Sequence, residues 1–174
     1  MAAATLVTSM DTAQGRGSGV AYEVEQVTLH DQPTLVVRDT VDEAGIGPFV
    51  GAAFTRVAEV AGQDGMHVSG PPFVRLRPDA DGAFALEAGF PVSGMVLGQG
   101  DVKASHLPGG PALRTTHRGD YARSRDAHEA LYAYAAQHGL VPAGDAWEVY
   151  LDGPDVAQPR TVVVLPTRPG AGPG

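Results

Sequence analysis

Glu148 is the residue whose type and surroundings most favour ligand chemistry in this sequence. It lies in a Trp-Glu-Val-Tyr segment that starts at Trp147, and strand alternation places Glu148 on one face together with Tyr150. A carboxylate flanked by bulky apolar residues needs a cation, a proton or a ligand, because an unpaired buried charge is strongly unfavourable. Two interpretations follow. Glu148 anchors a ligand, or it is a structural glutamate that is solvated or paired with Arg75 or Arg114.

Aromatic residues could supply the walls of a site around such a carboxylate. Tyr121 stands at the start of a predicted helix, where its phenol either donates a hydrogen bond into the site or packs between helix and strand. Tyr150 and Trp147 have the same two interpretations. Phe73 and Phe90 are better explained as core residues or pocket wall than as specific contacts.

Glu87 and His117 are two further candidates, each with a competing structural explanation. Internal duplication of the fold would place Glu87 near the seam opposite Glu148, and paired carboxylates can activate water or protonate a leaving group. A solvated Glu87 is the favoured interpretation, because it faces away from Phe90 on its strand and nearby Gly89 indicates close backbone packing. His117 ends a predicted strand before a glycine turn, where it could do acid–base work or hydrogen-bond the turn.

No cofactor and no metal site is expected from the sequence. The remaining five histidines lack the spacing of metal ligands, and the chain has no cysteine that could supply a thiolate. No nucleophile elbow, phosphate loop or dinucleotide fingerprint is present either. The glycines at 15–19 follow no predicted strand, so they do not indicate a nucleotide loop.

The charge of the chain argues against nucleic acid as a partner. Twelve basic and twenty acidic residues give a net charge of −8, and no basic run could follow a phosphate backbone. An acidic field raises the local concentration of cations, so a cationic small molecule is the favoured ligand. The first residues do not read as a signal peptide and no stretch has membrane-spanning length, so we expect a cytoplasmic location and no membrane partner.

Hydrophobic periodicity predicts an order of elements that occurs twice. Helical spacing indicates one helix that follows Pro48 and ends near Gly62, and a second from Asp120 to His138 with Gly139 as its C-terminal cap. Alternation and turn residues predict strands at 23–29, 33–41, 72–77, 84–92, 102–107, 112–117, 146–151 and 161–165.

The expected fold class is α+β. A duplicated strand-helix-strand-strand unit would form an antiparallel sheet with two main helices on one side and a ligand cleft at the pseudo-two-fold seam. Residues 21–167 would make up this domain. Residues 1–20 and 168–174 are small, polar and rich in glycine or proline, so both are expected to be flexible tails. The oligomeric state stays open.

Three stretches of the sequence form a recognisable series. They are Gly70-Pro71-Pro72-Phe73, then Leu107-Pro108-Gly109-Gly110 running into Thr116-His117-Arg118-Gly119-Asp120-Tyr121, and finally Trp147-Glu148-Val149-Tyr150. Together they resemble the GyrI-like small-molecule-binding family, which also forms the effector-binding half of AraC-type and multidrug-sensing regulators. Their order and spacing agree with the family over roughly residues 22–166, and the segment at 84–92 matches the family's Glu-x-Gly-x-Pro-Val as well.

The resemblance implies a duplicated fold of the SOUL/SHS2 type and a stand-alone member, since the sequence shows no helix-turn-helix segment. It implies that Glu148 lies in the cleft and recognises cationic or polar ligands, and it favours a structural hydrogen bond for His117. Two departures affect the expected shape of the site. Arg75-Leu76 stands where many relatives carry a tyrosine, and Ser124 stands where many carry a bulky aliphatic residue.

Three functions are compatible with these features. The first is binding of a hydrophobic, cationic or polar-aromatic small molecule, for sequestration, sensing or drug resistance. The second, implied by the resemblance, is a hydrolase that opens cyclopropane-bearing, DNA-alkylating natural products, with Glu148 orienting water and Tyr121 donating a proton. The third is a protective or inhibitory interaction with DNA gyrase or with a regulator, which an acidic surface would suit.

Overall fold

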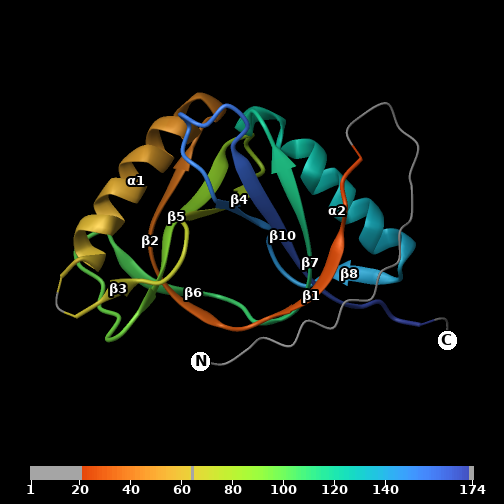
Figure 1. Ribbon diagram of the computed structural model, residues 1–174, viewed down its shortest axis with the longest axis horizontal. Helices are drawn as coiled ribbons and strands as arrows, with labels where there is room; N and C mark the ends of the chain where they lie inside the picture. The colour runs from red at the N-terminus through yellow and green to blue at the C-terminus, as the bar shows by residue number, and fades with distance from the viewer. Residues whose placement is uncertain (1–20, 64, 173–174) are drawn as a thin grey trace.

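The computed structural model describes residues 21–63 and 65–172, so the expected N-terminal tail lies outside the described part of the chain. The described residues form an antiparallel sheet of ten strands and two main helices, α1 (Ile46–Ala61) and α2 (Arg125–Gln137). The helices lie at opposite ends of the sheet (Figure 1). The expected α+β class, with an antiparallel sheet and two main helices, is confirmed.

The chain repeats one order of elements, and the strand pairings repeat with it. β5 pairs with β2, β4 and β3 in the first half, and β10 pairs with β7, β9 and β8 in the second. The first half consists of β1 (Glu25–Leu29), β2 (Gln32–Val41), a 3-10 turn η1 (Glu43–Gly45), α1, β3 (His67–Val68), β4 (Phe73–Pro78) and β5 (Phe84–Ser93). The second consists of β6 (Lys103–Leu107), β7 (Gly110–Arg118), a 3-10 turn η2 (Tyr121–Arg123), α2, β8 (Leu140–Pro142), β9 (Trp147–Tyr150) and β10 (Arg160–Pro169).

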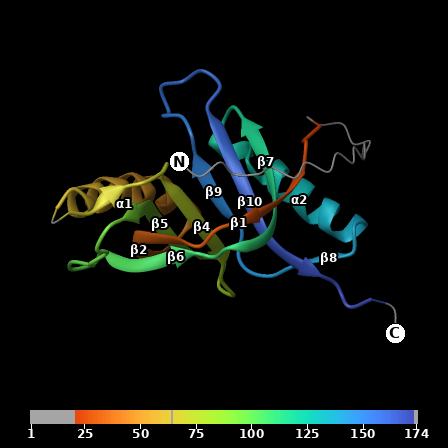
Figure 2. The same ribbon diagram turned by 60° about the horizontal axis from the view of Figure 1, so that its bottom comes forward.

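The two halves are joined at three places in the sheet. The leading strand of each half pairs with the other half, because β1 lies beside β7 and β6 lies beside β2. In the middle, β4 pairs with β9. The strand order is therefore β1-β7-β10-β9-β4-β5-β2-β6, and β9 is the strand of the α2 half that borders the α1 half (Figure 2).

The hydrophobic core lies on both faces of the curled sheet. Each helix covers one end of the same face, since residues from its apolar stripe pack on paired strands. The other face carries its own buried cluster without a helix over it. Fully burying one large aliphatic side chain contributes roughly 1.5–3 kcal/mol. The main contributors are Leu35, Val57 and Val60 between α1 and the sheet, Leu113, Leu131 and Val163 between α2 and the sheet, and Val36, Phe73 and Trp147 on the other face.

The structure differs from the expected elements in three respects. The second helix is preceded by the separate turn η2, because the Asp120 carboxylate accepts a hydrogen bond from the backbone N–H of Ala122 at 2.9 Å and caps that turn. The short strands β3 and β8 were not expected. β10 continues to Pro169 and pairs there with β8, so the expectation that residues 168 and 169 belong to a flexible tail is wrong. Within the described ranges, neither helix is long and apolar enough to cross a membrane.

Candidate functional site

Glu148 lies in the middle of β9 with its carboxylate turned toward the face that carries the helices. Its side chain is 17% exposed and accepts three hydrogen bonds. Ser124 Oγ donates to Oε1 at 2.7 Å, His128 Nε2 donates to the same oxygen at 2.8 Å, and the Tyr150 hydroxyl donates to Oε2 at 2.7 Å. Ser124 and His128 are one helical turn apart at the start of α2, which explains why both reach one oxygen.

These contacts keep Glu148 ionised and Tyr150 protonated at neutral pH. Burial alone would raise the pKa of Glu148, but the hydrogen bonds from His128, Ser124 and Tyr150, together with the charge of His128, outweigh it and hold the pKa below its ordinary value. Burial, followed by the adjacent Glu148 carboxylate, raises the pKa of the Tyr150 phenol far above its ordinary value. The site therefore holds a carboxylate anion in a largely buried place.

Aromatic rings continue from this carboxylate across the join between the halves. Tyr150 meets Tyr121 edge-on, with ring centroids 5.3 Å apart, and on its other side meets Phe54 of α1 at 6.1 Å. Phe54 in turn contacts Phe90 at 5.6 Å. The Tyr121 hydroxyl donates to the backbone carbonyl oxygen of Asp152 at 3.0 Å, so this phenol is held by the loop that follows β9. We call these four rings and Glu148 the seam site.

Three residues of the expected ligand-binding set lie on the opposite face of the sheet. Trp147 and Phe73 pack in the buried cluster there, 4% and 0% exposed. Glu87 lies between two arginines, accepting from Arg38 Nε at 2.7 Å and from Arg75 Nη2 at 2.7 Å. The expectation that Glu87 stands opposite Glu148 at the seam is therefore wrong, and so is the interpretation of Glu87 as a solvated residue, because its side chain is only 13% exposed.

The register between β4 and β9 explains why the first half supplies no second carboxylate. Val74 is paired with Glu148, while Phe73 pairs with Val149 and Arg75 with Trp147. This pairing is symmetric about the Val74–Glu148 pair, so duplication makes Val74, and not Glu87, the counterpart of Glu148. An apolar residue thus occupies the matching position.

Two of the three donors of Glu148, Ser124 and His128, are residues that sequence reasoning did not connect to it. The expected arginine partners are engaged elsewhere: Arg75 pairs with Glu87, and Arg114 pairs with Glu25 at 2.7 Å. Ser124 and His128 do share one face of the second helix, and that was predictable from their spacing. The missing information was which strand lies beneath that face.

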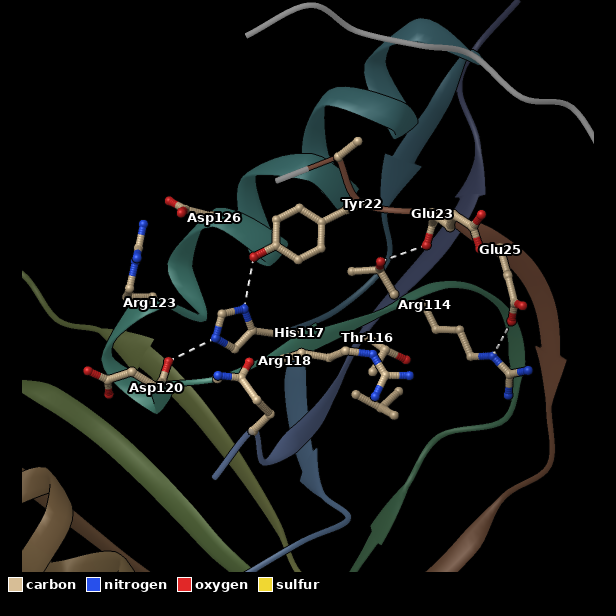
Figure 3. A pocket seen from close by; sticks show the side chains of 15 residues that line it. Tyr22, Glu23, Glu25, Arg114, Thr116, His117, Arg118, Asp120, Arg123 and Asp126 are labelled. Atoms are coloured by element: carbon tan, nitrogen blue, oxygen red, sulfur yellow. Dashed lines mark hydrogen bonds and ion pairs between the residues drawn. The ribbon is translucent and has the colours of Figure 1, made fainter. Parts of the chain in front are cut away.

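A polar hollow of about 860 Å³ lies on the outer side of the α2 half (Figure 3). In it, His117 Nε2 lies 2.8 Å from the backbone carbonyl oxygen of Asp120, and His117 Nδ1 lies 2.8 Å from the Tyr22 hydroxyl. Since a carbonyl only accepts, Nε2 donates to Asp120, while Nδ1 shares the second hydrogen bond with the Tyr22 hydroxyl. The expected structural hydrogen bond from His117 to the turn is confirmed. Tyr22 was not expected beside it.

Glu148 lines neither this hollow nor a smaller one of about 170 Å³ beside Glu87. In the seam site, the carboxylate is instead bonded by the chain's own donors and lies beside its own rings. Across the described ranges, no three His, Asp or Glu side chains come together in a group that could hold a metal ion. The arrangement suits recognition of a positive charge by an anion beside aromatic faces, after rearrangement of side chains.

Several solved structures share this fold at low sequence identity. The C-terminal domain of EcmrR has a TM-score of 0.72 at 18% identity, covering 86% of this chain and 99% of that domain. In the EcmrR–DNA complex the TM-score is 0.73 at 16% identity, and the match covers 85% of this chain but only 58% of the EcmrR chain. This chain therefore spans little more than half the length of EcmrR. No curated protein matches the sequence.

Two further likenesses concern proteins with stated chemistry. A hydrolase from Listeria innocua has a TM-score of 0.60 at 13% identity, covering 84% of this chain and 92% of that one. SAV2435 bound to tetraphenylphosphonium has a TM-score of 0.57 at 14% identity, covering 86% of this chain and 94% of that one. At such identities the likeness shows the fold alone. The sequence pattern of the GyrI-like small molecule binding domain matches residues 22–167, and the chain belongs to this family.

Proposed function

We propose that this protein binds a hydrophobic cation at the seam site, with Glu148 as the charged anchor. The observation that carries the proposal is a largely buried, ionised carboxylate at the join of the two halves, next to a series of aromatic rings. Such a carboxylate attracts a positive charge more strongly than an exposed one, because less water screens it. The ligand would be sequestered or sensed by this binding.

The rings contribute both area and charge recognition. Tyr150 and Tyr121 are adjacent to the carboxylate, and an aromatic face attracts a cation by roughly 0.5–2 kcal/mol. The net charge of −8 raises the local concentration of cations around the whole molecule. Membership of a small-molecule-binding family and the tetraphenylphosphonium bound to SAV2435 support the same ligand class.

Two observations favour binding over the alternative of cyclopropane-opening hydrolysis. Hydrogen bonds hold the pKa of Glu148 below its ordinary value, which makes the carboxylate a weak base toward water. The Tyr121 hydroxyl, proposed as the proton donor, is already committed to the Asp152 carbonyl. Incubation with a cyclopropane-bearing alkylating compound, followed by mass spectrometry, would detect water addition if hydrolysis occurs.

Titration with tetraphenylphosphonium at pH 8 by isothermal calorimetry tests the proposal. Replacing Glu148 by glutamine keeps the shape of the side chain but removes its charge. A charge-assisted contact contributes about 1.5–3 kcal/mol, so we expect the Kd to rise about 10- to 100-fold. Glu129→Gln is the matched control, because it removes the same charge from an exposed position of α2.

The control variant should bind like the wild type, within about twofold in Kd at moderate salt, because exposed charges are screened. Equal affinities of the wild type and Glu148→Gln would show that Glu148 is not the anchor. Absence of measurable binding to the wild type at pH 8 would contradict the ligand class itself.

A further inference from the structure

His128 already pairs with the Glu148 carboxylate, whose negative charge an incoming cation would need. The Nε2 atom of His128 lies 2.8 Å from Glu148 Oε1. Ser124 donates a hydrogen bond to the same oxygen, and Tyr150 donates one to Oε2. A carboxylate offers about four acceptor positions in all, so little of Glu148 is left free. The chain thus supplies its own ionisable group as the partner of the anchor.

Groups from β9 and from its own helix lie around this imidazole in the described ranges. His128 shares the Glu148 carboxylate with Tyr150 of β9 and with Ser124 at the start of its own helix. The nearby helix charges Arg125 and Glu129 pair with each other at the surface, where they are 85% and 66% exposed. Val74 and Val163 are the register partners of Glu148 on the adjacent strands, and Tyr121 and Phe54 lie beside Tyr150.

We propose that His128 determines which ligands bind and at what pH, by competing with them for Glu148. The proposal rests on the function proposed above. A permanent cation and an imidazolium ion cannot share one largely buried carboxylate without repulsion, so the cation binds when His128 is neutral. Binding of a permanent cation to the protein with a charged His128 must then release a proton.

The direction of the pH dependence follows from this exchange. An imidazole gains its charge within the range of pH 5 to 8, so at the acidic end the internal ion pair opposes the ligand. Release of one proton per ligand makes the affinity rise about tenfold per pH unit while His128 is charged. The affinity becomes independent of pH where ligand binding no longer releases a proton.

Tetraphenylphosphonium is a suitable probe because its charge does not depend on pH. We would measure its Kd from pH 5.5 to 8.0 by calorimetry, using two buffers of different ionisation enthalpy to count protons released. The variant His128→Gln keeps a side-chain donor for Glu148 but cannot become charged. The control His67→Gln removes an exposed histidine in β3, away from the seam site.

For the wild type and His67→Gln, we expect a rise in affinity of at least tenfold from pH 5.5 to 8.0, with proton release at the acidic end. His128→Gln should bind at least tenfold more tightly than the wild type at pH 5.5 and show no slope. A wild-type affinity without a pH slope, or an equal slope in His128→Gln, would overturn the role of His128 while leaving Glu148 as anchor. Failure of all three proteins to bind at pH 8 would instead contradict the proposed function, and the competition with it.

Discussion

Replacing Tyr150 by phenylalanine removes one of the three donors of the Glu148 carboxylate and leaves the aromatic ring in place. A hydrogen bond to a charged group contributes about 1.5–3 kcal/mol to stability. Ser124 and His128 still bond the carboxylate after the change, so it is not left unpaired and the loss stays within this range. We expect the free energy of unfolding at pH 7 to fall by about 1.5–3 kcal/mol.

This loss should depend on pH in a defined direction. The pKa of Glu148 is lowered in the folded protein, so its contribution to stability is full above the unfolded value of 4.5 and is lost as the pH falls through the folded-state pKa. Tyr150→Phe raises that folded-state pKa, because it removes a hydrogen bond that favours the anion. The deficit of the variant is therefore complete at neutral pH and shrinks as the pH falls below 4.5.

Urea unfolding followed by the fluorescence of Trp147 measures both effects, since this single tryptophan is buried in the folded state. Tyr132→Phe is the control, because Tyr132 lies on the same half of the molecule and is 46% exposed. Its effect should stay within about 0.5 kcal/mol. Equal stabilities of the two variants at pH 7, or a deficit for Tyr150→Phe that does not shrink in acid, would refute the reasoning.

Two further predictions concern the frame around the site. At Gly89 an added Cβ would overlap the carbonyl oxygen of Leu35, so Gly89→Ala should lower the free energy of unfolding by about 3 kcal/mol or more. Gly51 lies on open helix surface, so Gly51→Ala should raise the free energy of unfolding by about 0.5–1 kcal/mol. Urea unfolding measures the stability of both variants, and equal effects would contradict the close contact at Gly89. Hydrogen bonds from Arg160 lower the pKa of Asp152 to about 2. In Arg160→Gln, carboxyl NMR should find this pKa shifted up toward 3.8, and no shift would contradict the assignment.

The elements of the fold were predictable because their signals are local. Alternation in β5 correctly separates Glu87 from Leu86 and Phe90, and helical spacing correctly groups Leu131 with Ala135. Such patterns depend on residues a few positions apart. They show which residues share a face, without showing which face the helices cover. Alternation itself separates Trp147 from Glu148, because neighbouring residues of a strand face opposite sides, and Trp147 packs on the opposite face.

The partners of the site were not predictable because they depend on register between distant segments. Ser124 and His128 are 24 and 20 residues from Glu148, and Tyr22 is 95 residues from His117. No spacing rule connects positions so far apart in the sequence. Alternation placed Glu148 and Tyr150 on one face, and the family resemblance implied that Glu148 turns toward the cleft. The two donors from α2 required the pairing of β9 with β4 and β10, which sets α2 above Glu148.

The pairing of the first strand of each half with the other half limits how a ligand could reach the seam site. Backbone hydrogen bonds pair β1 with β7 and β6 with β2. The two halves are therefore joined at both ends of the sheet as well as in the middle, where β4 pairs with β9. A hinge that swings one half away from the other would break three rows of backbone hydrogen bonds at once. We therefore expect the proposed ligand to reach the carboxylate by rotation of side chains, without separation of the halves. Alone, each half would leave its leading strand without a partner, so neither half is expected to fold without the other.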